Sequence, residues 1–238
     1  MHSMNTSEAL LLRKAPYGDA DYILSIFTKD FGKISGIAKN AKKSMKRFGA
    51  RLEPFVHFRV MFKDSAKELR FLEDTETIQV FQNFIEDVEL FALGSLMLET
   101  TDALIPKESP NEELFELLIE ALSNLNSKRS PLPIVLQFQL QALSISGYEP
   151  SIDTCAKCER PIEGDSYFSI NGGGSVCFEC VGKRKNSFIF SKDFLLDSDS
   201  MESNLEKVLE YIKLFTKFTQ RHTEKELKSR RFIEELKL

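Results

Sequence analysis

All four cysteines of this chain stand in two pairs of identical spacing, Cys155-Ala-Lys-Cys158 and Cys177-Phe-Glu-Cys180. Eighteen residues separate the two pairs. A turn with two intervening residues can direct both sulfur atoms at one ion, and two such turns complete a tetrahedron. The pattern therefore predicts a zinc site with the ligands Cys155, Cys158, Cys177 and Cys180. Its binding energy would stabilise a segment that is too short to fold alone.

Two disulfides are the alternative for the same cysteines. The first residues, Met1-His2-Ser3-Met4-Asn5, lack the apolar core of a secretory signal. We therefore expect a cytoplasmic chain, in which thiols stay reduced. A thioredoxin-like redox pair is disfavoured because two pairs are present and neither opens a βαβ pattern.

Four thiolates close the coordination sphere of a zinc ion and leave no position for water or substrate. We therefore expect the zinc to be structural rather than catalytic. Some small zinc ribbons also contact a partner, and basic residues near the cysteines could serve there or simply form a solvated rim. They are Lys157, Lys183, Arg184 and Lys185.

The first 80 residues contain five short segments with the apolar, β-branched and aromatic content of strands. Turn-forming residues separate them at 16–19 and at 63–65. Five short strands in about 75 residues fit a small closed or partly closed barrel, and the OB-fold is the common five-stranded form. The expected strands lie at 9–12, 22–27, 33–38, 55–62 and from 68 onward.

From about residue 80 the apolar residues recur at helical spacing. Pro106 would stop the first helix, Ser109-Pro110-Asn111 would start the second, and the third would end near Gly147. The cysteine segment, with a glycine-turn hairpin at 167–176, then interrupts the helices. The expected helices lie at 84–104, 114–125, 136–143, 205–218 and 224–238.

Together these patterns predict an α+β multidomain protein. Residues 1–80 form an OB-fold nucleic-acid-binding domain, and residues 81–150 and 186–238 form an all-helical domain. Residues 151–185 form a four-cysteine zinc ribbon inserted into it. The chain has no run of about 20 apolar residues, so we expect no membrane span and no membrane partner.

Basic side chains concentrate in residues 29–51, although the chain as a whole carries a formal charge of -4. The only acidic residue in this stretch is Asp30. Lysine and arginine release counterions from phosphates, and an aromatic ring offers a stacking face to an unpaired base. The stretch therefore predicts a nucleic-acid contact, with an ordinary solvated loop as the alternative. The candidate residues are Lys29, Lys33, Lys39, Lys42, Lys43, Lys46, Arg47, Phe48 and Arg51.

Patterns for catalysis are poorly supported. The chain has three histidines, His2, His57 and His222, and none stands in an H-E-x-x-H motif. His222-Thr223-Glu224 matches the first part of a zinc-deaminase signature, but no P-C-x-x-C follows it. The run at 172–174 lacks the P-loop pattern and reads as a turn. We therefore predict no catalytic residues and no enzyme activity.

Stretches spread over nearly the whole chain carry a family resemblance. They are the four cysteines and the segments Leu12–Asp21, Phe27–Lys33, Ala38–Lys43, Leu52–Phe55 and Leu227–Phe232. In order and spacing they resemble the bacterial RecO family of recombination mediators. The resemblance implies an N-terminal OB-fold and a helical domain with a zinc-binding element set into it.

The resemblance also implies a function and partners. Such a protein binds single-stranded and double-stranded DNA, anneals complementary strands and works with RecR. Together they help to displace single-strand-binding protein so that RecA can load onto gapped DNA. The place implied is the cytoplasm, in association with the nucleoid during repair.

The helical domain of the family receives the acidic, hydrophobic C-terminal tail of single-strand-binding protein. Here residues 81–150 offer only Lys107, Lys128 and Arg129 to such a tail. The positive charge could come instead from the C-terminal helices. The basic residues there are Lys213, Lys217, Arg221, Lys228 and Arg230.

Two other functions stay open on the residues alone. A zinc-dependent nuclease, or another enzyme that modifies nucleic acids, would need a metal-bound water or a cluster of carboxylates in a cleft. An RNA-binding protein with an OB-fold and a zinc ribbon would prefer structured RNA to single-stranded DNA.

Overall fold

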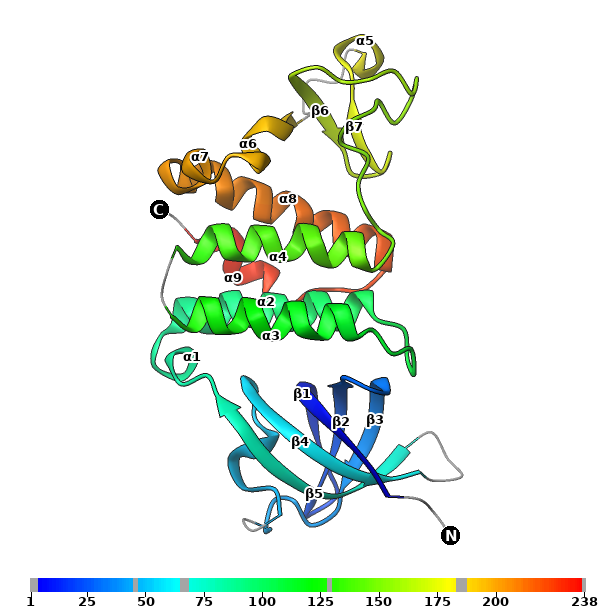
Figure 1. The fold of residues 1–238 in the computed structure, drawn as a ribbon, viewed down its shortest axis with the longest axis vertical. Coiled ribbons are helices and arrows are strands. Elements are labelled where there is room, and N and C mark those ends of the chain that lie inside the picture. The colour runs from blue at the N-terminus through cyan, green and yellow to red at the C-terminus, as the bar shows by residue number, and fades with distance from the viewer. Residues whose placement is uncertain (1–3, 45–46, 65–68, 128–129, 183–187, 237–238) are drawn as a thin grey trace. The chain divides into compact units, whose positions relative to one another are not determined.

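The computed structural model describes residues 4–44, 47–64, 69–127, 130–182 and 188–236. The chain divides into two compact units, Met1–Arg129 and Ser130–Leu238. The first unit holds a β-barrel and helices α1 to α3, and the second holds helices α4 to α9 and a small sheet (Figure 1). The domain boundaries predicted from the sequence, after residues 80, 150 and 185, follow changes of secondary structure and differ from this division. They stay a prediction.

Five strands close the barrel of the first unit. They are β1 (Met4–Tyr17), β2 (Asp21–Thr28), β3 (Gly32–Ala38), β4 (Val56–Lys63) and β5 (Leu69–Val80). Their order is β1-β2-β3-β5-β4, with β4 returning to β1. Only the β3–β5 pair is parallel among these strands. This arrangement confirms the predicted five-stranded OB-fold.

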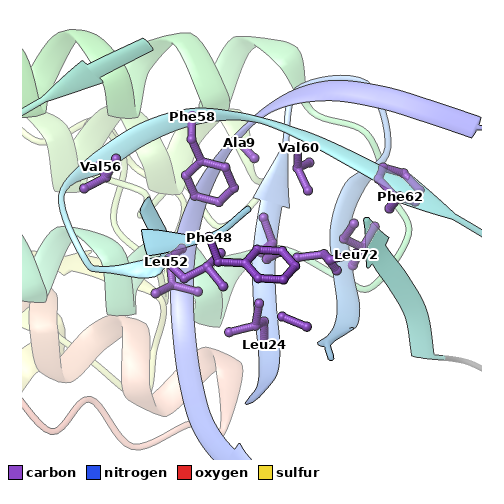
Figure 2. Close-up of a cluster of buried hydrophobic side chains, with 13 residues drawn as sticks. Ala9, Leu24, Phe48, Leu52, Val56, Phe58, Val60, Phe62 and Leu72 are labelled. Atoms are coloured by element: carbon purple, nitrogen blue, oxygen red, sulfur yellow. The ribbon is translucent and has the colours of Figure 1, made fainter. Parts of the chain in front are cut away.

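The barrel interior is filled by apolar side chains that alternate along the strands. Along β4, Phe58, Val60 and Phe62 are buried at every second position, as expected when one face of a strand looks inward (Figure 2). Phe48, from the connection between β3 and β4, adds its ring to this cluster. Thr75 of β5 holds the connection in place, because its backbone N–H and its hydroxyl both donate to the carbonyl of Arg47.

Three helices follow the barrel, α1 (Asn83–Glu86), α2 (Val88–Leu104) and α3 (Glu112–Asn126). The predicted single run from residue 84 is broken at Asp87, whose extended backbone ends α1. Its carboxylate caps α2 by accepting from two backbone N–H groups of the first turn. Asn111 caps α3, as the start signal before this helix predicted.

Helix α3 packs on the barrel. The ring of Phe115 lies edge-on to Phe27 of β2, at 5.3 Å between centroids, and contacts His57 of β4 at 5.9 Å. All three side chains are buried. The barrel and these helices therefore share apolar contacts within the first unit.

The second unit pairs two long helices, α4 (Pro131–Ile145) and α8 (Leu205–Thr223). In their buried interface the amide of Gln139 donates to the hydroxyl of Thr216 at 2.9 Å. Helix α8 ends at Glu224, which takes a left-handed conformation with φ of 56°. The prediction of a helix throughout 224–238 is therefore wrong, because only α9 (Arg230–Glu235) is helical there among the described residues.

The cysteine segment contributes a three-stranded sheet of β6 (Asp165–Ser169), β7 (Gly174–Val176) and β8 (Phe188–Ser191), in the order β7-β6-β8. The hairpin of β6 and β7 confirms the predicted glycine turn. Strand β8 was not expected, and it extends this sheet beyond residue 186. Short helices α5 (Phe178–Val181), α6 (Lys192–Leu196) and α7 (Ser198–Ser203) complete the unit.

The small sheet is attached to α8. The ring of Phe168 in β6 lies 5.7 Å from the rings of both Phe215 and Phe218. At the hairpin turn, Arg221 donates to the side chain of Asn171 at 2.8 Å. No helix among the described residues has the length and apolar character needed to cross a membrane.

Candidate metal centre and nucleic-acid interface

The structure gathers the four cysteine sulfur atoms within 4.8 Å of one another. Cys155 and Cys158 lie on the turn before β6, and Cys177 and Cys180 lie at α5. All four are free thiols, so the two disulfides that were the alternative do not form. The sulfur atoms of Cys158 and Cys177 are 3.8 Å apart. Tetrahedral zinc with bonds of about 2.3 Å places its sulfur ligands about 3.8 Å apart, so the cluster fits this ion.

Hydrogen-bond donors surround the sulfur atoms. The backbone N–H groups of Lys157 and Cys177 donate to Cys155 at 3.5 and 3.4 Å, and the Arg160 guanidinium donates to Cys158 at 3.5 Å. Such donors hold metal-bound thiolates in place.

These contacts give the thiols unequal pKa values. Burial opposes ionisation of Cys155, but the backbone N–H groups outweigh it and lower its pKa to about 6. The bond from Arg160 lowers the pKa of Cys158. Bonds to Cys177 and Cys158 raise the pKa of Cys180 to about 12. A divalent cation would stabilise all four thiolates together.

The barrel divides the predicted basic stretch between its two ends. Strands β2 and β3 are antiparallel, with Phe27 opposite Lys33 and Tyr22 opposite Ala38. Lys29 and Lys33 therefore lie at one end, and the segment that follows Ala38 lies at the other. A strand of this length separates the ends by roughly 23 Å.

Lys33 is buried, with 8% of its surface exposed. Its ammonium group donates to the carbonyl of Asp102 at 2.7 Å and to the carboxylate of the same residue at 3.1 Å. Arg13 contacts the other carboxylate oxygen at 2.5 Å. The charge of Lys33 is therefore enclosed, which disfavours the predicted contact with DNA, and that contact stays a prediction.

Lys29 lies beside two carboxylates of α3. Its ammonium group is 2.5 Å from Glu116 and 3.2 Å from Glu112, and these bonds raise its pKa. The end of the barrel that carries Lys29 is therefore locally acidic. It is a poor surface for a phosphate backbone.

Phe48 has no stacking face to offer. Its ring is 0% exposed and lies in the barrel core, with the Arg47 guanidinium 5.0 Å from its centroid (Figure 2). The burial of this ring disfavours the predicted stacking on a base, which stays a prediction. The apolar residue is needed to close the interior beneath the β3–β4 connection.

The opposite end of the barrel carries four further basic residues of the stretch, Lys39, Lys42, Lys43 and Arg47. Lys39 pairs with Asp21 at 2.7 Å, and this bond lowers the pKa of Asp21. Lys42 donates to the carbonyl of Gly18 at 2.9 Å, and Lys43 is exposed. Arg47 donates to the carbonyl of Lys39 at 2.9 Å. The connection is thus folded onto the β1–β2 turn.

Arg51 and Lys46 are the last two residues of the predicted DNA-binding stretch. Arg51 is half-buried on a short 3-10 helix, Gly49–Leu52. Lys46 lies outside the described residues, as do Lys183, Arg184 and Lys185 near the cysteines.

Two tyrosines at the same end of the barrel, Tyr17 and Tyr22, were not among the DNA-binding residues predicted from the sequence. Tyr22 is half-buried, with the ammonium groups of Lys14 and Lys42 at 5.1 and 5.7 Å from its ring centroid. Tyr17 is 52% exposed on the other side of the turn. The available signal was the position of Tyr17 within the predicted turn at 16–19 and of Tyr22 at the start of the strand predicted after it. We call this set the barrel-end surface: Lys14, Tyr17, Tyr22, Lys39, Lys42, Lys43 and Arg47.

Among the described residues, the four cysteines are the one group of histidine, cysteine or carboxylate side chains gathered closely enough to hold a metal ion. His57 is buried in β4, 3.0 Å from the carboxylate of Glu8. His222 contacts the carbonyl of Ile170 at 3.0 Å. The four cysteines are therefore the candidate metal centre of the described residues.

Comparison with known proteins identifies the family. The model described as "Recombination protein O N terminal" matches residues 1–81, and "Recombination protein O C terminal" matches residues 85–231. The DNA repair protein RecO of Desulfatibacillum aliphaticivorans is 34% identical over 250 residues, which cover 98% of this chain and 97% of the relative. The DNA repair protein RecO of Caldanaerobacter subterraneus subsp. tengcongensis is 29% identical over 244 residues, which cover 97% of each chain. The two family models and both relatives point to the same family, and the chain belongs to the RecO family of DNA repair proteins.

Proposed function

We propose that this chain is a mediator of DNA repair and recombination, without catalytic turnover. It binds single-stranded and double-stranded DNA, anneals complementary strands, and with RecR helps to load RecA onto DNA coated by single-strand-binding protein. The barrel-end surface carries this proposal, because it joins four basic residues of the predicted stretch to two tyrosines on a five-stranded barrel. OB-folds bind oligonucleotides with the face of strands 2 and 3 and with the loops that join strands 1 to 2 and 4 to 5. The four basic residues lie on the β3–β4 connection, which is folded onto the β1–β2 turn through the bond from Lys42 to Gly18.

The parts of the chain would divide the work. Residues 1–80 grip DNA, the helical residues of 81–150 and 186–238 hold partner proteins, and the ribbon of 151–185 is fixed by structural zinc. The partners are RecR and the C-terminal tail of single-strand-binding protein, with RecA acting indirectly. The place of action is the cytoplasm, at the nucleoid during repair.

The role of zinc is to hold the ribbon together. Four thiolates of Cys155, Cys158, Cys177 and Cys180 fill a tetrahedral ion, so no position remains for a reacting water. The ion would thereby hold the turn that carries Lys157 against the short helix that carries Cys180. The ammonium group of Lys157 donates to the carbonyl of Cys180 at 2.8 Å.

An annealing assay tests the function. Complementary strands coated with single-strand-binding protein are mixed with and without the full chain, and duplex formation is followed by fluorescence. We expect faster annealing without any nucleotide. A requirement for ATP, or no acceleration, would contradict the proposal.

A salt titration of binding to single-stranded DNA tests the barrel-end surface. Replacing Lys39, Lys42, Lys43 and Arg47 by alanine should weaken binding to single-stranded DNA. It should also flatten the log-log salt dependence by about 0.7 per lost phosphate contact. For a matched control, Lys42→Ala with Lys43→Ala is compared with Arg59→Ala with Lys63→Ala on β4. Both pairs remove two positive charges from the barrel, and equal effects would show that only net charge matters.

A further inference from the structure

The second unit contains a hollow between the small sheet, α5 and α8. Its volume is about 760 Å³, which is within the usual range for ligand sites. Apolar side chains of the small sheet and of α8 form its wall, including Phe168, Val176 and Leu214. The contacts of Phe168 with two rings of α8 fix the sheet against the helix, so the wall is built into this unit.

The hollow is positively charged. Lys157 comes from the cysteine turn, and Lys213 and Lys217 come from one face of α8, four residues apart. Among the described residues, neither of these two lysines forms an ion pair, although Lys213 donates to the carbonyl of Leu236 at 3.5 Å and the charges of both lysines act on Glu234. Lys157 donates one hydrogen bond to the carbonyl of Cys180, and an ammonium group has three donors. Among the described residues of the lining, Glu210 is the one acidic residue, so an anion is the ligand that these charges favour.

Aromatic rings also line the hollow. Tyr167 and Phe188 are half-buried, and both belong to the lining. Half-buried rings beside lysines suit an unpaired base with its phosphate, because the base stacks and the phosphate meets the charge. Bases inside a duplex are not available for such stacking. The chemistry therefore favours single strands over duplex DNA.

We propose that this hollow is a second binding site for single-stranded DNA. The inference rests on the proposed function, because annealing requires that two strands be held by the same protein. The barrel-end surface takes one phosphate backbone, and the hollow takes bases and phosphates of the other. Each site acts through its own residues.

The first test is photo-crosslinking of the full chain to an oligodeoxythymidylate that carries 4-thiothymidine. Mass spectrometry of the crosslinked peptides should identify the segment around Tyr167 as well as the barrel. Crosslinks confined to the barrel would overturn the proposal.

The second test reads affinity by fluorescence anisotropy with a fluorescein-labelled oligodeoxythymidylate. Lys217→Glu should weaken binding and lower the salt slope by about 0.7. Lys207→Glu is the matched control, because it makes the same charge change on α8 but does not line the hollow. Glu210→Gln should tighten binding, since it removes the opposing charge. Equal behaviour of the two lysine variants would refute the site.

The two sites can fail separately. If only the barrel variant of Lys39, Lys42, Lys43 and Arg47 weakens binding, the hollow is not a DNA site and the proposed function stands. If only Lys217→Glu does so, the hollow stands and the barrel-end surface is wrong.

An acidic peptide is the competing ligand for a basic, apolar hollow. A fluorescein-labelled peptide that combines aspartate with phenylalanine and ends in a free carboxylate serves as the probe. If Lys217→Glu abolishes peptide binding and leaves oligonucleotide binding unchanged, the hollow receives a protein tail and the DNA proposal is overturned.

Discussion

The ammonium group of Lys33 lies 2.7 Å from the carbonyl oxygen of Asp102 and 3.1 Å from its carboxylate, and both residues are buried. Arg13 shares the carboxylate from a mostly exposed position. The contact joins β3 of the barrel to the last turn of α2. A basic residue of the predicted DNA-binding stretch thus serves to attach the barrel to its helices.

Removing this ammonium group should destabilise the fold without changing how the protein meets DNA. Lys33→Ala leaves the buried carboxylate of Asp102 with less compensation, and we expect the free energy of unfolding to fall by about 3 kcal/mol. Urea denaturation followed by circular dichroism measures this loss. The combined change Lys33→Met with Asp102→Leu should cost less, because no charge is left buried. A lower salt slope of DNA binding in folded Lys33→Ala protein would instead restore Lys33 as a DNA contact.

Truncating the ring of Phe48 should act on stability in the same way. Phe48→Ala leaves a cavity in the barrel core and should lower the free energy of unfolding by about 3 to 5 kcal/mol. Phe48→Leu keeps most of the volume and should cost less. Urea titration ranks the three proteins. DNA affinity at matched folded fractions should be equal among them, and a selective loss of affinity would show that the ring is a stacking platform after all.

Loss of one cysteine should release the metal and loosen only the ribbon. Elemental analysis should find one zinc ion per wild-type chain and almost none after Cys155→Ser. Hydrogen exchange should then rise in β6 and β7, whose turn contacts depend on the cluster, and stay low in β1 to β5. Wild-type protein treated with a chelator is the control and should match the variant. Wild-type protein without stoichiometric zinc would show that the four cysteines do not form a zinc site.

Acid should weaken the barrel through His57. Burial lowers the pKa of this imidazole in the folded chain despite the carboxylate of Glu8 nearby. The unfolded chain therefore binds the proton more readily, and the free energy of unfolding should fall as the pH drops below the ordinary value of about 6.5. Urea titrations between about pH 7.5 and about pH 5.5 measure this slope. In His57→Leu protein the slope should be smaller, and an unchanged slope would contradict this role of His57.

Local patterns were enough to find the elements of the fold. Apolar, β-branched and aromatic residues located the five strands of the barrel, and Ser109-Pro110-Asn111 marked the start of α3, which Asn111 caps. The spacing of the cysteines predicted that they would meet, because each pair acts through a short turn and needs no long-range information. Strand β8 was missed because four residues give little periodicity and their pairing partner lies about twenty positions earlier.

The candidate DNA residues were harder to predict because charge density along the chain does not record burial. The pairing of β2 with β3 sends Lys29 and Lys33 away from Lys39, although all three are close in sequence. The partner that encloses Lys33 comes from α2, far along the chain. Tyr22 joins the basic residues only after the hairpin and the β3–β4 connection have folded together.

The double hydrogen bond from Thr75 to the carbonyl of Arg47 has a consequence for recognition. It fastens Arg47 to β5 at the same place where Phe48 enters the core, and Arg47 in turn donates to the carbonyl of Lys39, so Lys39 is carried on an anchored backbone. A support that is already ordered loses little conformational entropy when a ligand arrives. The barrel can therefore meet a flexible strand while holding its own shape, and the cost of ordering falls on the DNA.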